Sequence, residues 1–286
     1  MASIRAILPW LLLAGGSLVA QAPAIEPVLQ AELAFARLAD QKGIRAAFLA
    51  WMTADARVFT PRMTSAKVQY SPEPGDPGHL AWYPEAMGMA RSGELAWSFG
   101  PWTYAVKKGE AILVNGHYLS LWRRQSSGLW RAEADIGIPH AAPERPIEPF
   151  APWDASSALK NRVSTGPDAT PMLRRKEADL STAWAKQGGL ALLPELAKEA
   201  RVLRPRALPA RAAAEIQKVL ETDMPGATWE PDRIQVASSG DLAWTCGETR
   251  PQEGVRTASF LRVWILEAGA WKVLFDVRLP HPASPK

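Results

Sequence analysis

The sequence predicts an α+β fold, in which helices come first and antiparallel strands follow, and it predicts this order twice. The first observation is periodicity, because apolar residues at helical spacing precede strand-like runs that short turns connect. The second observation is an internal repeat. Residues 82–97 recur as residues 229–244, and eight of the sixteen aligned positions are identical. With its flanking matches the repeated unit reaches roughly 110 to 120 residues, which is the size of a domain.

The repeat divides the chain into two copies. Upstream of the main match, residues 55–61 align with residues 199–205, and downstream Trp122 aligns with Trp264 and Asp135 with Asp276. The expected organisation is a signal peptide at 1–24, a first domain at 25–140, a Pro-rich linker at 141–171, a second domain at 172–282 and a tail at 283–286.

In the first copy the pattern predicts helices followed by strands. Helices are expected at residues 28–39 and 44–52, and strands at 57–60, 80–90, 95–106, 116–124 and 130–136. Pro61 ends the first strand, and a Pro- and Gly-rich loop is expected over residues 62–78. The turns at 92–94 and 126–128 each contain glycine and are short enough for antiparallel hairpins.

The second copy repeats this plan with an extra helix. Its helices are expected at residues 179–187, 190–200 and 212–221, ahead of the matching strands. The linker is rich in proline and therefore favours an extended, semi-rigid spacer. Trp153 within it is expected to pack on one of the domains.

Composition narrows the class of protein. The chain has 286 residues, 47% of them hydrophobic and 22% charged, which is typical of a globular protein. The net charge of +4 is scattered along the chain, so no nucleic-acid partner is expected. The single cysteine excludes a disulfide framework within the chain. Cys246 aligns with Phe99 of the other copy, which predicts a buried apolar role.

The amino-terminal segment predicts export. Arg5 precedes an apolar stretch over residues 7–19, and Ala20-Gln21-Ala22 forms a small-x-small cleavage signature. Cleavage after residue 20, 22 or 24 is consistent with this pattern. We expect a periplasmic or secreted protein with no membrane span after cleavage, the alternative being an uncleaved membrane anchor.

Several motifs together resemble a known family. These are two early helices, Trp-x-Pro, Ser-Gly-Glu-Leu-Ala-Trp, the run from Gly116 to Trp122, Gly128-x-Trp130 and Asp135-Ile-Gly. The chain resembles the SnoaL-like branch of the nuclear transport factor two-like superfamily. The resemblance implies cone-shaped domains, each with N-terminal helices packed in a strongly curved antiparallel sheet that leaves a cavity. Relatives include isomerases, dehydratases and polyketide cyclases, and also non-catalytic ligand-binding and dimerisation modules.

The resemblance also implies a candidate site in the first copy. Such enzymes need a carboxylate or imidazole in an apolar cavity and a donor that stabilises an oxyanion. Asp135 is the candidate general base and Tyr118 the candidate donor, although the recurrence of Asp135 in both copies favours a structural role. By parity Asp135 is expected to share a strand face with Arg131 and Glu133. Aromatic residues expected to line the pocket are Trp51, Trp102, Tyr104, Tyr118 and Trp122.

The remaining histidine and cysteine residues do not predict a metal or cofactor site. Four histidines are spread without ligand spacing, and His140 and His281 are expected to make capping or linker contacts. The first hypothesis is therefore an exported protein that binds a small apolar or amphipathic molecule without catalysis. The alternatives are a metal-independent lyase or isomerase acting in the first-copy cavity, and an intramolecular pseudo-dimer that serves as a scaffold or partner-binding module.

Overall fold

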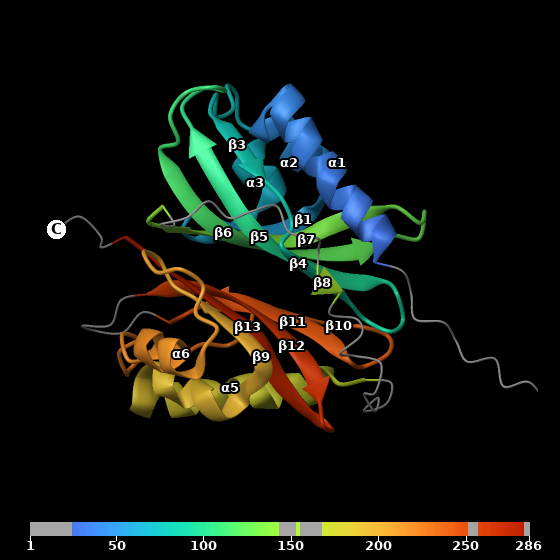
Figure 1. The fold of residues 1–286 in the computed structure, drawn as a ribbon. Helices are drawn as coiled ribbons and strands as arrows, with labels where there is room; N and C mark the ends of the chain where they lie inside the picture. Colours follow the sequence, from blue (N-terminus) through green and yellow to red (C-terminus); the bar gives the residue numbers. More distant parts are fainter. Residues whose placement is uncertain (1–24, 143–152, 155–167, 251–256, 283–286) are drawn as a thin grey trace, which may run out of the picture.

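The computed structural model describes residues 25–142, 153–154, 168–250 and 257–282. These residues form two open, curved sheets that face each other, with helices on the outer side of each sheet (Figure 1). The predicted α+β class is confirmed. We call residues 25–142 the first half and the described residues from 168 onward the second half. The expected signal peptide, most of the linker and the tail lie outside the described residues.

The first half contains three helices and most of an eight-stranded sheet. The helices are α1 (Glu26–Lys42), α2 (Ile44–Trp51) and α3 (Ala66–Tyr70). The strands are β1 (Met52–Phe59), β2 (Met63–Ser65), β3 (His79–Trp82), β4 (Ala86–Met89), β5 (Leu95–Ala105), β6 (Val114–Arg124) and β7 (Trp130–His140). Their order is β2-β1-β7-β6-β5-β4, with β3 also paired to β5. The linker strand β8 (Trp153–Asp154) pairs with β4 at the edge.

The second half has the same arrangement of its main strands. It contains α5 (Thr170–Gln187), a 3-10 helix η1 (Gly188–Glu195), α6 (Ala213–Leu220), β9 (Leu196–Leu203), β10 (Arg233–Val236), β11 (Leu242–Glu248), β12 (Ala258–Glu267) and β13 (Ala270–Pro280). The strand order β10-β11-β12-β13-β9 corresponds to β4-β5-β6-β7-β1. The last pair in each series is parallel, namely β7 with β1 and β13 with β9. The other pairs in both series are antiparallel. A duplicated domain predicts this correspondence, and the duplication stays a prediction.

Helix α1 forms and packs for reasons visible in its sequence. Val28, Phe35 and Ala39 are buried and recur at helical spacing, so that one face of the helix meets the sheet. Pro27 lies in the first turn, where its missing N–H removes no helical hydrogen bond. Gly43 ends the helix with a φ of 84°, a conformation that glycine adopts without steric cost.

Three local predictions were wrong. Residues 190–200 do not form an α-helix, because the 3-10 helix η1 ends at Glu195 and the following residues pair with β13 as β9. The expected loop at 62–78 contains β2 and α3, and the Ser65 hydroxyl accepts a hydrogen bond from the Val68 N–H at the start of α3. The expected strand at 80–90 divides into β3 and β4, which flank Pro84.

A β-bulge changes which residues of β7 share a face. Leu121 of β6 pairs with Ala134 and Trp122 pairs with Ala132, so one extra residue lies between them in β7. The alternation of faces therefore reverses at Glu133. The prediction that Asp135 shares a face with Arg131 and Glu133 was wrong, and Asp135 points toward the helices. The second half has the same shift in β13, around Leu274.

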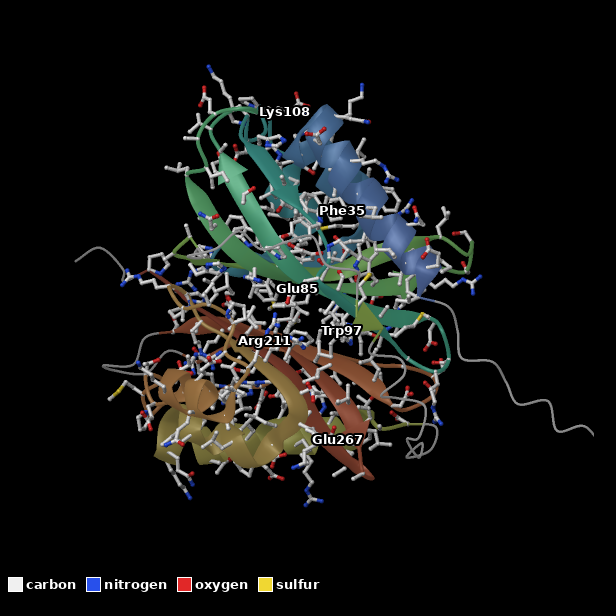
Figure 2. All side chains as sticks on the ribbon, viewed as in Figure 1. Phe35, Glu85, Trp97, Lys108, Arg211 and Glu267 are labelled. Atoms are coloured by element: carbon white, nitrogen blue, oxygen red, sulfur yellow. The ribbon has the colours of Figure 1, made fainter. Side chains whose placement is uncertain are left out.

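The two sheets pack face to face through an apolar core. Trp97 and Phe99 of β5 contact Phe275 of β13, with ring centroids 4.8 and 5.2 Å apart. Trp97 lies between the two halves (Figure 2). Cys246 is fully buried in the same core, and its Sγ lies 3.7 Å from the Met63 sulfur. Its predicted buried apolar role is confirmed.

Polar contacts surround this core. The backbone N–H of Ser92 donates to the Ser239 hydroxyl at 3.2 Å, and the backbone N–H of Ser239 donates to the Ser92 hydroxyl at the same distance. The repeat aligns these two serines with each other, so each half meets its own counterpart, as in a twofold interface. The Arg211 guanidinium of the second half pairs with Glu85 of the first (Figure 2). Within the described residues, no helix has the length and apolar character needed to cross a membrane.

Candidate functional site

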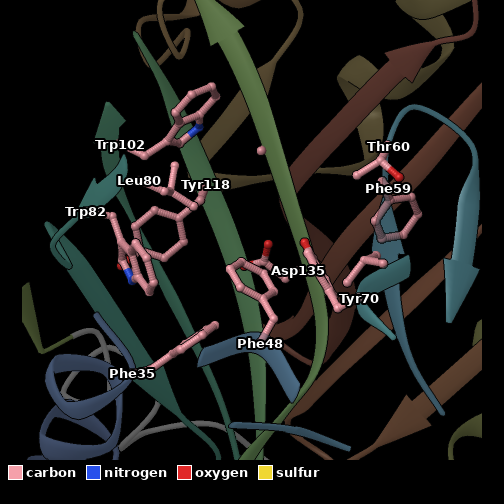
Figure 3. Close-up of a pocket in the computed structure, with 12 residues that line it drawn as sticks. Phe35, Phe48, Phe59, Thr60, Tyr70, Leu80, Trp82, Trp102, Tyr118 and Asp135 are labelled. Carbon is pink, nitrogen blue, oxygen red and sulfur yellow. The ribbon is translucent and has the colours of Figure 1, made fainter. Parts of the chain in front are cut away.

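A cavity of about 190 Å³ lies in the first half, between the sheet and the helices that cover its outer side (Figure 3). Its lining is mostly aromatic and comprises Phe35, Phe48, Val58, Phe59, Thr60, Tyr70, Leu80, Trp82, Trp102, Tyr118, Asp135 and Gly137. An outer opening of about 370 Å³ adjoins the cavity and shares Thr60, Tyr70, Leu80 and Trp102 with it. These four residues therefore form the boundary between the two spaces.

Asp135 is the carboxyl group in the lining of this cavity. Its carboxylate accepts one hydrogen bond, from the Ser120 hydroxyl at 2.6 Å. Burial raises the pKa of Asp135 to about 7, and the nearby charge of Glu32 contributes to the rise. The side chain is part-exposed because it borders the cavity. At neutral pH this carboxyl therefore exchanges readily between its charged and neutral forms.

Glu32 is a second buried carboxyl, which the sequence reasoning missed. It is fully buried on α1 and accepts hydrogen bonds from the indole N–H of Trp82 at 2.6 Å and of Trp122 at 3.1 Å. The Ser98 hydroxyl also donates to it. Burial raises the pKa of Glu32 above its ordinary value in spite of these hydrogen bonds. A signal was present, because Glu32 interrupts the apolar face of its helix.

Two hydrogen-bond donors in the cavity lining have no partner. The Tyr118 hydroxyl faces Glu32 and Ser98 but forms no hydrogen bond of good geometry. Burial raises the pKa of Tyr118 well above 10, and the charges of Glu32 and Asp135 raise it further, so the phenol stays protonated. The Trp102 indole N–H is also buried without a partner. Both residues line the cavity.

The Trp102 ring occupies space that two glycines leave free. A Cβ atom at Gly116 would lie 2.3 Å from the indole carbons, which is far inside contact distance. A Cβ atom at Gly137 would lie 3.2 Å from the indole nitrogen. The missing side chains at these positions therefore let Trp102 lie close to β6 and β7, beside the cavity.

The other predicted pocket residues lie outside the inner cavity. Tyr104 lines the outer opening, and its hydroxyl donates to Asp76 at 2.9 Å. Trp122 is fully buried where α1 covers the sheet, and its indole N–H is used by Glu32. Trp51 lies edge-on to Trp122, with ring centroids 6.4 Å apart, and does not line the cavity. The assignment of catalytic and pocket residues stays a prediction.

The second half contains the counterparts of both carboxyls. Strand pairing places Asp276 where Asp135 lies, and Glu177 on α5 corresponds to Glu32 on α1. Glu177 accepts a hydrogen bond from the Trp229 indole at 2.8 Å, as Glu32 does from its own tryptophan. Unlike Glu32, it is also paired with the Arg262 guanidinium at 2.7 Å.

Arginines fill the polar part of the second half. Arg262 Nε donates to Asp276 at 2.5 Å, and Arg204 donates to the same carboxylate at 2.6 Å. Burial pushes the pKa of Asp276 upward, but the two guanidinium groups outweigh it and hold the pKa below its ordinary value. Arginine side chains thus balance the charges of Glu177 and Asp276 in the second half. The equivalent carboxyls of the first half, Glu32 and Asp135, have no such cation among the described residues.

Three of the histidines, His117, His140 and His281, make contacts with other side chains of the protein. The His117 and His140 rings are joined by a hydrogen bond of 2.7 Å, and His117 stacks on Phe99 on the face toward the other sheet. His281 contacts the Thr257 hydroxyl at 2.9 Å near the end of the second half. In the part of the chain that the structure describes, no group of three or more His, Cys, Asp or Glu residues is arranged to hold a metal.

No protein-family model and no curated protein matches the chain. Among solved structures, it is similar to an NTF2-like protein of unknown function from Shewanella baltica, with 13% identity and a TM-score of 0.32 over 41% of this chain and 99% of that one. A ketosteroid isomerase-like protein from Erwinia carotovora atroseptica has 15% identity and a TM-score of 0.34, covering 41% of this chain and 97% of that one. An NTF2-like protein of unknown function from Silicibacter pomeroyi has 15% identity and a TM-score of 0.31, covering 40% of this chain and 98% of that one. Likeness at this level does not place the chain in a family.

Proposed function

We propose that the protein binds a small apolar or amphipathic molecule in the cavity of its first half. The observation that carries this proposal is the cavity lining, in which aromatic side chains surround one carboxyl, Asp135, and two unused donors, Tyr118 and Trp102. Small-molecule sites typically combine an apolar wall with a few convergent polar groups of this kind. A bound molecule would satisfy the donors that the protein itself leaves without partners.

We also propose that the protein is exported and consists of two copies of one domain related to the SnoaL-like branch. The leader pattern at residues 1–24 supports export. Equal strand order, equivalent bulges and the aligned pairs Glu32 with Glu177 and Asp135 with Asp276 support the duplication. The reciprocal contact of Ser92 and Ser239 supports an intramolecular pseudo-dimer.

Calorimetric titration with 2-phenylethanol, a small neutral amphipathic probe, tests the binding proposal. Gly137→Val places a side chain beside Trp102 in the cavity, so it should abolish saturable binding while the wild-type protein binds. The matched control is Leu129→Val, at a residue that is 57% exposed in the turn between β6 and β7. Equal binding by the Gly137→Val protein would contradict the proposal, and so would the absence of saturable heat from the wild type both with this probe and with a charged amphipathic probe of the same shape.

Proton transfer is a second candidate function, and the raised pKa of Asp135 favours it. A general base works best when its pKa lies near the working pH, and that of Asp135 is about 7. Asp135 would take a proton from a carbon next to a carbonyl, and the electron pair would move to the carbonyl oxygen. The Trp102 N–H or the Tyr118 hydroxyl would donate to that oxyanion.

Hydrogen–deuterium exchange of cyclohexanone in D₂O tests this second function. The protein should accelerate loss of the α-proton signal, followed by NMR, above the rate in buffer. Asp135→Asn should slow the catalysed exchange by about 100-fold or more, because the base is lost. Exchange at the same rate in the wild type and the variant would exclude Asp135 as the base.

A further inference from the structure

In the second half, one arginine pairs with both buried carboxyls, Glu177 and Asp276. The buried guanidinium of Arg262 lies between Glu177 and Asp276, with N–O distances of 2.7 and 2.5 Å. Its central carbon also lies 4.7 Å from the centre of the Trp229 ring and 4.5 Å from that of Phe260. Two carboxylates and two aromatic faces therefore hold one organic cation.

Every group that holds this guanidinium has a counterpart in the first half. The carboxyls correspond to Glu32 and Asp135, and the aromatic rings correspond to Trp82 and Tyr118. Strand pairing puts Ser120 opposite Asp135, as it puts Arg262 opposite Asp276 in the second half. The four groups around the cation are thus kept, while the cation itself is missing.

Two further arginines of the second half are also replaced in the first. By strand register, Arg204 corresponds to Thr60 and Arg278 corresponds to Gly137. Both Thr60 and Gly137 line the cavity. Among the described residues of the chain, no lysine or arginine pairs with Glu32 or Asp135. The loss of the three arginine side chains therefore opens space and removes positive charge at the same place.

We propose that the first-half cavity binds an organic cation, a primary ammonium or guanidinium group on an apolar body, with its charged end at Asp135, close enough to Glu32 to be attracted by its charge as well. This inference rests on the proposed function and names the ligand class of that site. The ligand supplies the charge that Arg262 supplies in the second half. Buried carboxylates are stable when a cation pairs with them, so the site gains more from a cation than from a neutral ligand of the same shape.

The remaining lining sets the shape of the ligand. Trp82 and Tyr118 line the same cavity as Asp135, so an ammonium group bound there can also donate to the phenol oxygen. Phe35 and Phe48 continue the wall and accept an apolar body. Trp102, at the passage to the outer opening, presents an N–H that suits an acceptor at the far end of the ligand.

Calorimetry with two isosteric probes tests the inference on the full chain. 2-Phenylethylamine is a cation at pH 8, and 2-phenylethanol is its neutral counterpart. We expect the wild-type protein to bind the amine at least about tenfold more tightly than the alcohol, which corresponds to about 1.4 kcal/mol. Equal affinities, or tighter binding of the alcohol, would overturn the inference while the proposed binding function stands. Binding of neither probe would overturn both.

Two variants separate charge from shape. Asp135→Asn keeps the size of the side chain and should remove the preference for the amine while leaving binding of the alcohol. Ser120→Arg places a guanidinium where the second half has Arg262, so it should abolish amine binding and raise the melting temperature. Ser120→Met adds bulk without charge and should not stabilise the protein. An amine preference that persists in the Asp135→Asn protein would overturn the inference, even if the Ser120→Arg protein failed to fold.

Discussion

Replacing Asp135 by asparagine should change how the stability of the protein depends on pH. An aspartate in an unfolded chain has a pKa of about 3.9, whereas burial raises that of Asp135 in the folded protein to about 7. Between these values the folded protein binds one proton more than the unfolded chain. The stabilisation linked to this proton is fully present below about pH 4 and is lost as the pH rises through about 7. The wild-type protein should therefore lose stability over this interval relative to the variant.

The expected magnitude follows from the two pKa values. A pKa difference of about 3 corresponds to about 4 kcal/mol in total, of which about 2.5 kcal/mol should appear between pH 5 and pH 8. This is an upper value, because the Asp135 carboxylate borders the cavity and is not enclosed on all sides. The amide oxygen that the substitution introduces can still accept the hydrogen bond of Ser120, so packing is retained.

Urea unfolding at pH 5, 6, 7 and 8 measures this effect. The free energy of unfolding of the variant minus that of the wild type should increase with pH, and the subtraction cancels other titrating groups. Asp276→Asn is the matched control in the second half, where Arg204 and Arg262 hold the pKa of the carboxyl low. That variant should be destabilised at neutral pH. A difference for Asp135→Asn that stayed constant or decreased from pH 5 to pH 8 would refute the reasoning.

Three further substitutions have defined expectations. Arg262→Met should destabilise the protein by about 3–5 kcal/mol in urea unfolding, because it leaves Glu177 buried without its cation; an unchanged midpoint would contradict this. Gly116→Ala should lower stability by about 1–3 kcal/mol and shift tryptophan fluorescence, because the added methyl group meets the Trp102 ring. Trp97→Ala removes a fully buried ring from the core between the sheets and should cost about 3–5 kcal/mol; a loss below about 1 kcal/mol would show that this core contributes little.

Sequence periodicity predicted much of the fold because its signals are local. The apolar spacing in α1 and the glycine turn at Gly93 specify elements without any tertiary contact. Tyr118 and Ser120 alternate along β6, and the structure places the first beside the cavity and the second beside Asp135. Local chemistry was therefore sufficient for the helices, the hairpins and the faces of regular strands.

The remaining features depend on tertiary contacts. The bulge at Glu133 follows from pairing between β6 and β7, so strict alternation along the sequence assigned the wrong neighbours to Asp135. The strand β9 is stabilised by its neighbour β13 and not by its own pattern. Glu32 acquires its role from indole donors that lie 50 and 90 positions away, and no spacing rule connects such residues.

The contact between Ser92 and Ser239 has a consequence for how the two sites can differ. In a homodimer, every substitution appears on both sides of the interface, so that two equivalent cavities open or close together. Here both sides belong to one chain, and a substitution alters one side alone. Arg262 can therefore pair with the buried carboxyls of one half, while Ser120 leaves Asp135 of the other half without a cation. Selection can therefore change the interior of one half without changing that of the other.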